Sequence, residues 1–130
     1  MEQLVSVFIP QNQLETDLQA AQADPENFGA FLKKFLLAEV YVPSVTDVEK
    51  DPESFRPVLY DKKGEPLMIV FTSKDRAKAV AHIGQFGMPL RVATLVKRMP
   101  PGTGLFVNPG ESVSFNMSAE GLRRLGQGFY

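Results

Sequence analysis

The sequence predicts an α+β fold, a single compact domain with helices packed on a mixed or antiparallel sheet. The length of 130 residues suits one domain, and a hydrophobic content of 44% is enough to form a core. Some apolar residues recur at helical spacing, whereas others alternate or form the short continuous runs typical of strands. No repeat of fixed period is present. We therefore expect one domain over residues 1–130, with residues 1–12 as a more loosely attached N-terminal segment.

Two helices are expected near the N-terminus. Residues 14–21 place apolar side chains at helical spacing, and Asn12 can cap this helix. Asp24 followed by Pro25 predicts an N-cap and a proline in the first turn of a second helix. The apolar stripe of this second helix, which we expect to pack in the core, consists of Phe28, Phe31, Leu32, Phe35 and Leu36.

Strands are expected in the middle of the chain. Residues 38–42 are rich in β-branched and aromatic side chains, and Pro43 is expected to end this strand. Residues 58–60 and 67–71 flank the glycine-containing loop 61–65, which predicts a β-hairpin. The segment 67–71 is apolar throughout, so we expect it to be a central strand.

Helical and extended segments then alternate. The four residues 72–75 fit the Ser/Thr-x-x-acid capping pattern, so a helix is expected to run from there to Gly84. Residues 90–92 predict a short extended piece, and residues 93–99 predict one or two helical turns.

The C-terminal third predicts two strands and a helix. Residues 104–107 form an apolar run, and residues 113–117 alternate apolar and polar side chains as a half-buried strand does. Ser118 is expected to cap a last helix over residues 119–125.

Between these two strands, Asn108, Pro109 and Gly110 supply the residues that a type II turn requires. Turns held by strands are frequent recognition sites, so we predict a binding rim at Asn108, Pro109 and Gly110 in addition to the turn. If Asn108 serves the turn only through a local hydrogen bond, its replacement by alanine should change stability little.

Composition excludes several classes of site. The formal net charge of −1 gives no overall attraction for nucleic acid or an anionic membrane, so we expect neither as a partner. The chain has no cysteine and one histidine, His82, so we expect no metal, no cofactor and no nucleophilic triad. The N-terminus lacks the pattern of a signal peptide, and no apolar run approaches the length of a membrane span. We therefore expect a soluble, cytoplasmic protein.

A family resemblance rests on the order of several segments. An aromatic-rich helix leads into 38–43, the strand at 69–71 opens into a capping pattern, and 104–110 precedes a serine-capped helix at 118–122. This order resembles the N-terminal domain of the SseB family, bacterial proteins named for enhanced serine sensitivity. The likeness covers about residues 14–125. Family members often carry a second, C-terminal domain, which we do not expect in a chain of this length. The resemblance implies no established enzymatic activity and a protein that acts by binding.

Acidic residues offer two further candidate sites. Asp47, Glu49 and Asp51 are spaced like the first ligands of a calcium loop, but Pro52 and Val58 stand where that loop needs glycine and glutamate. We expect a solvated, mobile acidic loop there. Paired carboxylates of a hydrolase would have to come from the acidic residues Glu39, Asp61 and Glu65.

The function expected from the sequence is a non-enzymatic protein-interaction or regulatory module that binds another protein through an edge strand or an exposed apolar patch. Its support is a content of 10 Phe and 3 Tyr residues, including Phe129 and Tyr130 beyond the last helix. A sensor domain for an amino-acid-like metabolite is the alternative, and a hydrolase with paired carboxylates is a third possibility. A deep cleft with two carboxylates would favour the hydrolase, and a closed pocket with polar anchors would favour the sensor.

Overall fold

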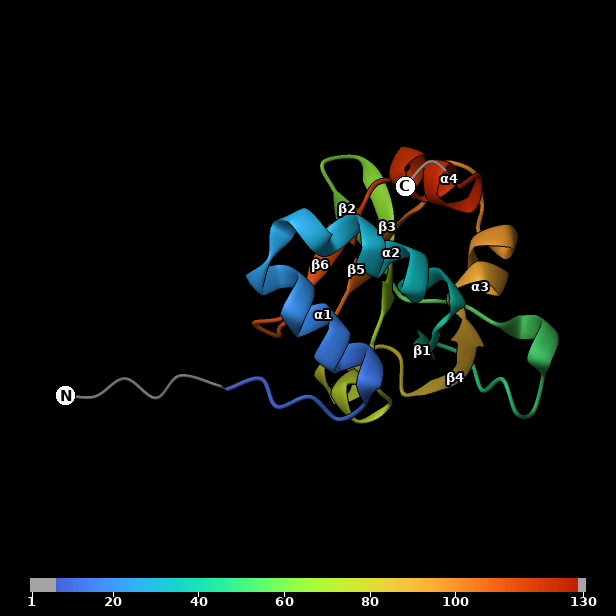
Figure 1. The fold of residues 1–130 in the computed structure, drawn as a ribbon. Helices are drawn as coiled ribbons and strands as arrows, with labels where there is room; N and C mark the ends of the chain where they lie inside the picture. Colours follow the sequence, from blue (N-terminus) through green and yellow to red (C-terminus); the bar gives the residue numbers. More distant parts are fainter. Residues whose placement is uncertain (1–6, 129–130) are drawn as a thin grey trace.

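The frame of the fold consists of a four-stranded sheet and a two-stranded sheet (Figure 1). This computed structural model describes residues 7–128, so expectations for residues 1–6, Phe129 and Tyr130 lie outside the described residues. The larger sheet contains β2 (Leu59–Lys62), β3 (Glu65–Val70), β5 (Gly104–Val107) and β6 (Phe115–Met117) in that order. β3 and β5 are parallel and the other neighbours are antiparallel, so the sheet is mixed. The predicted α+β class is confirmed, as is the central position of the second hairpin strand.

β1 (Glu39–Ser44) and β4 (Phe86–Arg91) form the antiparallel two-stranded sheet. The expectation that Pro43 ends the first strand is wrong, because β1 continues through it and pairs Pro43 with Gly87. Tyr41 exchanges both backbone hydrogen bonds with Phe71, so its N–H and C=O face away from β4. Pro43 lies two residues further along and faces the same way. Its missing N–H therefore removes no hydrogen bond from the β1–β4 pair.

β4 begins earlier than residues 90–92, where the sequence predicts an extended piece. Glycine and proline at positions 87 and 89 weaken the local strand signal, but pairing with β1 outweighs it. Gly87 is also required by packing, because a Cβ there would lie 2.7 Å from the ring of Tyr41. The aromatic ring of β1 thus lies directly against the backbone of β4.

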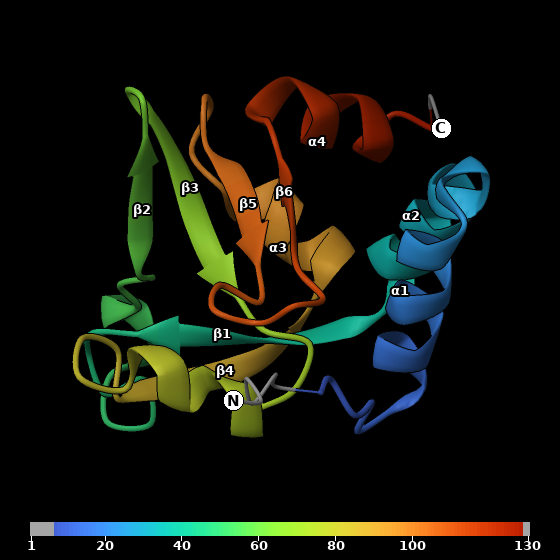
Figure 2. The ribbon, with the colours of Figure 1, turned by 90° about the vertical axis from the view of Figure 1, so that its left-hand side faces the viewer.

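Four α-helices cover the larger sheet within the described residues. They are α1 (Gln13–Ala23), α2 (Phe28–Leu37), α3 (Val92–Arg98) and α4 (Ala119–Gly126). In Figure 2, α1 and α2 lie beyond β6, α4 begins above the upper end of β6 and runs toward α2, and α3 lies behind the sheet. The predicted caps at both ends of the chain are confirmed: Asn12 accepts the N–H of Glu15, and Ser118 accepts that of Gly121.

Two other predicted caps are wrong. Asp24 makes no capping hydrogen bond, and the 3₁₀-helix η1 (Pro25–Asn27) separates it from α2. The 72–75 segment does not start an α-helix, because the residues that follow form the 3₁₀-helix η3 (Asp75–Val80) without a side-chain cap. The Thr72 side chain instead bonds Glu15 and Asn108, residues distant in sequence. This tertiary use of the hydroxyl replaces the local cap.

The β2–β3 hairpin is tighter than the loop 61–65 predicted. Lys62 pairs with Glu65, so only Lys63 and Gly64 form the turn. Their φ values of 52° and 92° are both positive, as in the type I′ turn whose twist matches that of paired strands. The strand ladder therefore reaches almost to the tip of the hairpin.

The core lies mainly between the larger sheet and its helices. Phe31, Leu32 and Phe35 of α2 are buried as predicted, and Phe115 of β6 packs edge-on against Phe35 at 5.4 Å between ring centroids. A second, smaller cluster lies on the opposite face of the sheet and consists of Val58, Ile69, Phe71, Ala77 and Val80. Tyr41 and Phe106 pack against this second cluster. None of the helices within residues 7–128 is long and apolar enough to cross a bilayer.

Candidate functional site

The predicted type II turn at Asn108, Pro109 and Gly110 is confirmed. The N–H of Glu111 donates to the carbonyl of Asn108 at 3.1 Å, and Gly110 has a φ of 89°. The Asn108 side chain, however, is fully buried. It cannot contact a partner at the surface, so the predicted rim loses this residue. Binding at the outward part of the turn, Pro109 and Gly110, stays a prediction.

Asn108 connects three parts of the chain through its side-chain amide. Its Oδ1 accepts the N–H of Thr72 at 3.0 Å, and its Nδ2 donates to Thr72 Oγ1 at 2.8 Å and to the Val113 carbonyl at 3.2 Å. Its φ of 58° lies in the left-handed region, which asparagine tolerates better than most residues. The residue is therefore a structural support for the end of the sheet.

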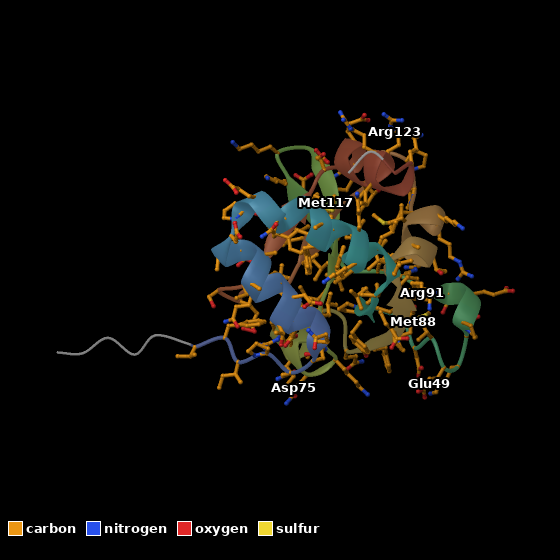
Figure 3. All side chains as sticks on the ribbon, in the orientation of Figure 1. Glu49, Asp75, Met88, Arg91, Met117 and Arg123 are labelled. Atoms are coloured by element: carbon orange, nitrogen blue, oxygen red, sulfur yellow. The ribbon has the colours of Figure 1, made fainter. Side chains whose placement is uncertain are left out.

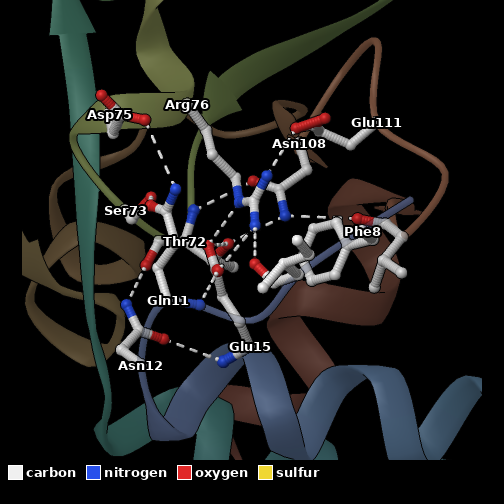
Figure 4. A network of polar contacts seen from close by, with 12 residues as sticks. Phe8, Gln11, Asn12, Glu15, Thr72, Ser73, Asp75, Arg76, Asn108 and Glu111 are labelled. Carbon is white, nitrogen blue, oxygen red and sulfur yellow. Dashed lines mark hydrogen bonds and ion pairs between the residues drawn. The ribbon is translucent and has the colours of Figure 1, made fainter. Parts of the chain in front are cut away.

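Asn108 belongs to a larger polar network, formed by Glu15, Thr72, Arg76, Asn108 and Glu111 (Figure 4). Glu15 of α1 is fully buried, and it is not among the candidate residues identified from the sequence. Its carboxylate accepts Arg76 Nε at 2.7 Å and Arg76 Nη2 at 2.9 Å. Such a two-point contact fixes the orientation of the guanidinium as well as its position.

Arg76 also holds the segment that precedes α1. Its Nη1 donates to Glu111 at 2.8 Å, its Nη2 donates to the Ile9 carbonyl at 2.8 Å, and its guanidinium lies 3.9 Å from the centre of the buried Phe8 ring. Gln11 accepts the hydroxyl of Ser73 at 2.6 Å. The part of the segment 1–12 from Phe8 onward is therefore fixed to the domain by specific contacts, although the sequence predicts a looser attachment.

The polar network has its partners inside the protein. Burial by itself would raise the pKa of Glu15, but hydrogen bonds from Arg76, Thr72 and the Gln11 backbone lower that pKa below its ordinary value. The Glu15 contact in turn raises the pKa of Arg76. Among the described residues, every buried side-chain nitrogen and oxygen has a hydrogen-bond partner. The buried part of the polar network is therefore satisfied by the protein itself.

The three carboxylates considered for a hydrolase lie apart. Glu65 begins β3 and accepts the N–H of Ala119 at 2.9 Å, so it helps to cap α4. Glu39 and Asp61 are exposed and belong to different sheets. Glu65 lies opposite Lys62 in the β2–β3 pair, so its side chain and that of Asp61 point to opposite faces of the sheet. The fold therefore does not arrange these three residues as an acid–base pair.

The acidic loop after β1 uses its side chains to support its own backbone. Asp47 accepts the N–H of Glu49 at 3.0 Å, and Asp51 accepts that of Glu53 at 3.2 Å. In Figure 3, Glu49 lies on this loop, away from Asp75 on η3. Over residues 7–128 the structure contains no cluster of three His, Cys, Asp or Glu side chains able to hold a metal ion.

The strongest candidate for contact with another molecule is the outer edge of β2, which we call the open edge. β2 is the end strand of its sheet, and Figure 2 shows no segment along its outer side. The N–H of Ile69 donates to the Val58 carbonyl at 2.9 Å, so the backbone of residue 58 faces β3. In an antiparallel pair, the backbone N–H and C=O groups of successive residues point alternately toward the partner strand and away from it. The backbone groups of Tyr60 therefore also face β3, whereas those of Leu59 and Asp61 face outward.

Apolar side chains accompany this open edge. Leu59 is 55% exposed and Tyr60 is 48% exposed. The Tyr60 ring packs edge-on against Phe106 of β5, with 5.5 Å between ring centroids, so it is held in place on the face of the sheet. Unpaired backbone groups and fixed apolar side chains therefore occur together at this strand.

Two hollows provide other candidate sites. One, of about 840 Å³, lies between the hairpin tip, the end of α3 and α4, and Pro66, Met99 and Leu122 contribute apolar surface to it. The other, of about 480 Å³, lies beside Tyr41 and is lined by Glu39, Glu49 and Lys74, among others. Burial, together with the charge of Glu49, raises the pKa of Tyr41. The phenol therefore stays protonated at neutral pH.

The fold and these sites define a small α+β domain that uses its buried polar residues for its own architecture and has one strand, β2, whose outer edge is unpaired. The family model of the SseB protein N-terminal domain matches residues 14–124. The chain belongs to this family, and the resemblance seen in the sequence is confirmed. Neither a curated protein nor a solved structure matches the chain.

Proposed function

We propose that this domain is a non-enzymatic protein-interaction module and that its open edge binds an extended segment of a partner protein. The observation that carries the proposal is the outward direction of the N–H and C=O groups of Leu59 and Asp61 beside two exposed apolar side chains. A peptide strand added to such an edge gains affinity from backbone hydrogen bonds and specificity from alternate side chains.

The charges on β2 are consistent with a selective site. Asp61 and Lys62 are both exposed on a strand of only four residues, and short, charged edges resist indiscriminate aggregation. A partner would have to accommodate these charges while covering Leu59 and Tyr60. The open edge thus favours a specific segment over any extended chain.

Proline substitution at Leu59 tests this proposal. Leu59→Pro removes an outward N–H and no hydrogen bond to β3, whereas Leu59→Ala keeps the N–H and removes most of the side chain. The wild type and both variants would be immobilised and used to capture proteins from the native cell extract, after thermal melting has established that each is folded. We expect Leu59→Pro to lose partners that the wild type retains. Retention of the same partners at the same level would refute docking at the open edge.

The hollow beside Tyr41 supports a second candidate function, the binding of an amino-acid-like metabolite. Glu39 and Glu49 could face an ammonium group, and Lys74 could face a carboxylate, because all three line the same hollow. Free amino acids at a hundred times their dissociation constant would stabilise the domain by about 2.7 kcal/mol, which a thermal melt detects. The absence of such a shift across the common amino acids, up to high millimolar concentration, would count against a sensor.

A cytoplasmic location stays a prediction.

A further inference from the structure

We propose that a second copy of this chain can occupy the open edge, with the two β2 strands antiparallel about a two-fold axis that passes beside Tyr60. This inference rests on the proposed function, since it assigns an occupant to the same edge. In this register Leu59 of each copy pairs with Asp61 of the other. Two outward residues on each strand then satisfy one another through four backbone hydrogen bonds.

The residues at either end of β2 make this register the only complete one. Moving the axis toward the start of the strand would pair Asp61 with Pro57, which has no N–H to donate. Moving it toward the hairpin tip would pair Leu59 with Lys63, whose φ of 52° removes it from the extended conformation. It would also place the two Asp61 side chains directly opposite each other. Only with the axis at Tyr60 are all the outward backbone N–H and C=O groups of Leu59 and Asp61 paired.

The side chains are compatible with this register. The two Tyr60 residues would form the closer, non-hydrogen-bonded type of pair across the axis. Each Tyr60 ring already packs on Phe106, so the pair would join two existing aromatic contacts into one row of four rings. Lys62 lies on the same face of the strand, diagonally adjacent to Tyr60 of the second copy, where a cation can interact with the ring.

The length of the edge indicates a reversible association. Four residues of β2 form a contact well below the size of a standard stable interface. We therefore expect monomers at low concentration and dimers as the concentration rises. A covalent trap is the appropriate test, because it records a short-lived pairing and its register together.

The chain contains no cysteine, so each single-cysteine variant carries one thiol. Under mild oxidation, Tyr60→Cys should form a disulfide-linked dimer, because the two side chains face each other across the axis. Leu59→Cys and Asp61→Cys should each stay monomeric alone and form a mixed dimer when combined. His82→Cys, at an exposed position outside β2, is the control for random collision.

Sedimentation of the cysteine-free wild type and Leu59→Pro provides a second measurement, which does not depend on the folding of the cysteine variants. We expect the average mass of the wild type to rise with concentration and that of Leu59→Pro to stay at one chain. Cross-linking of Tyr60→Cys no greater than that of His82→Cys, or self-linking of Leu59→Cys, would overturn the proposed pairing. If such a result accompanied loss of captured partners in Leu59→Pro, the second copy would be excluded while the proposed function stood.

Discussion

Replacing Asn108 with alanine should destabilise the domain strongly, although the turn alone would predict a small effect. The substitution removes three side-chain hydrogen bonds and leaves the N–H of Thr72, a residue 2% exposed, without an acceptor. An unsatisfied buried group costs about 1–3 kcal/mol, and each of the other two lost bonds contributes about 1 kcal/mol. Alanine at a φ of 58° adds about 1 kcal/mol of backbone strain. We expect a loss of about 4–6 kcal/mol in the free energy of unfolding.

Urea denaturation of the wild type, Asn108→Ala and Asn108→Gly would measure this loss. Glycine also lacks the amide but tolerates the positive φ, so we expect Asn108→Gly to be about 1 kcal/mol more stable than Asn108→Ala. The difference between the variants isolates the backbone term, and the remaining loss measures the hydrogen bonds. A free energy of unfolding for Asn108→Ala within about 0.5 kcal/mol of wild type would refute this reasoning, since surface substitutions have effects of that size.

Three further predictions concern the interior. The pKa of Glu15 is lower in the folded state than in the unfolded chain. The ionised carboxylate therefore contributes fully to the free energy of unfolding above its unfolded pKa of about 4.3, and this contribution is lost as the pH falls through the folded pKa. Urea denaturation at a series of pH values should show this loss in the wild type, and Glu15→Gln should reduce the pH dependence while lowering stability at neutral pH. A Cβ at Gly104 would overlap the carbonyl oxygen of Met117, so Gly104→Ala should prevent the native β5–β6 pairing; a cooperative melt near the wild-type temperature would contradict this. Phe35→Ala should cost about 3–5 kcal/mol, because the ring is fully buried; a variant of wild-type stability would show that α2 does not pack as described.

Local patterns predicted most of the elements but not all of their limits. The α2 stripe and the Asn12 and Ser118 caps depend on residues within one or two turns, so the sequence displays them directly. β1 continues through Pro43 and β4 begins at Phe86 because each is supported by the other strand. A pairing between segments that far apart has no signature within either segment alone. The same reason explains why Thr72 is not a helix cap.

The polar network could not be predicted from the sequence. Glu15, Arg76 and Glu111 lie in three separate segments, and none stands in a recognisable motif. The one local sign was an acidic residue three positions before the buried Leu18, on the inner side of an amphipathic helix. The exposed Leu59 and Tyr60 were visible as strand residues, but only the order of the strands shows that β2 is an edge.

The parallel pairing of β3 with β5 has a consequence for the order of folding. β2 and β3 are joined by a two-residue turn, so this hairpin can form within about 1–10 μs, whereas residues 71–103 must fold back before β5 can reach β3. Thr72 and Asn108 lie just beyond the ends of these two strands, so their mutual hydrogen bonds require that the strands have paired. We therefore expect the arrival of β5 to be the slow, topology-limited step and Asn108 to stabilise the paired strands afterwards. Substitutions at Asn108 should accordingly act mainly by accelerating unfolding and leave the rate of hairpin formation unchanged.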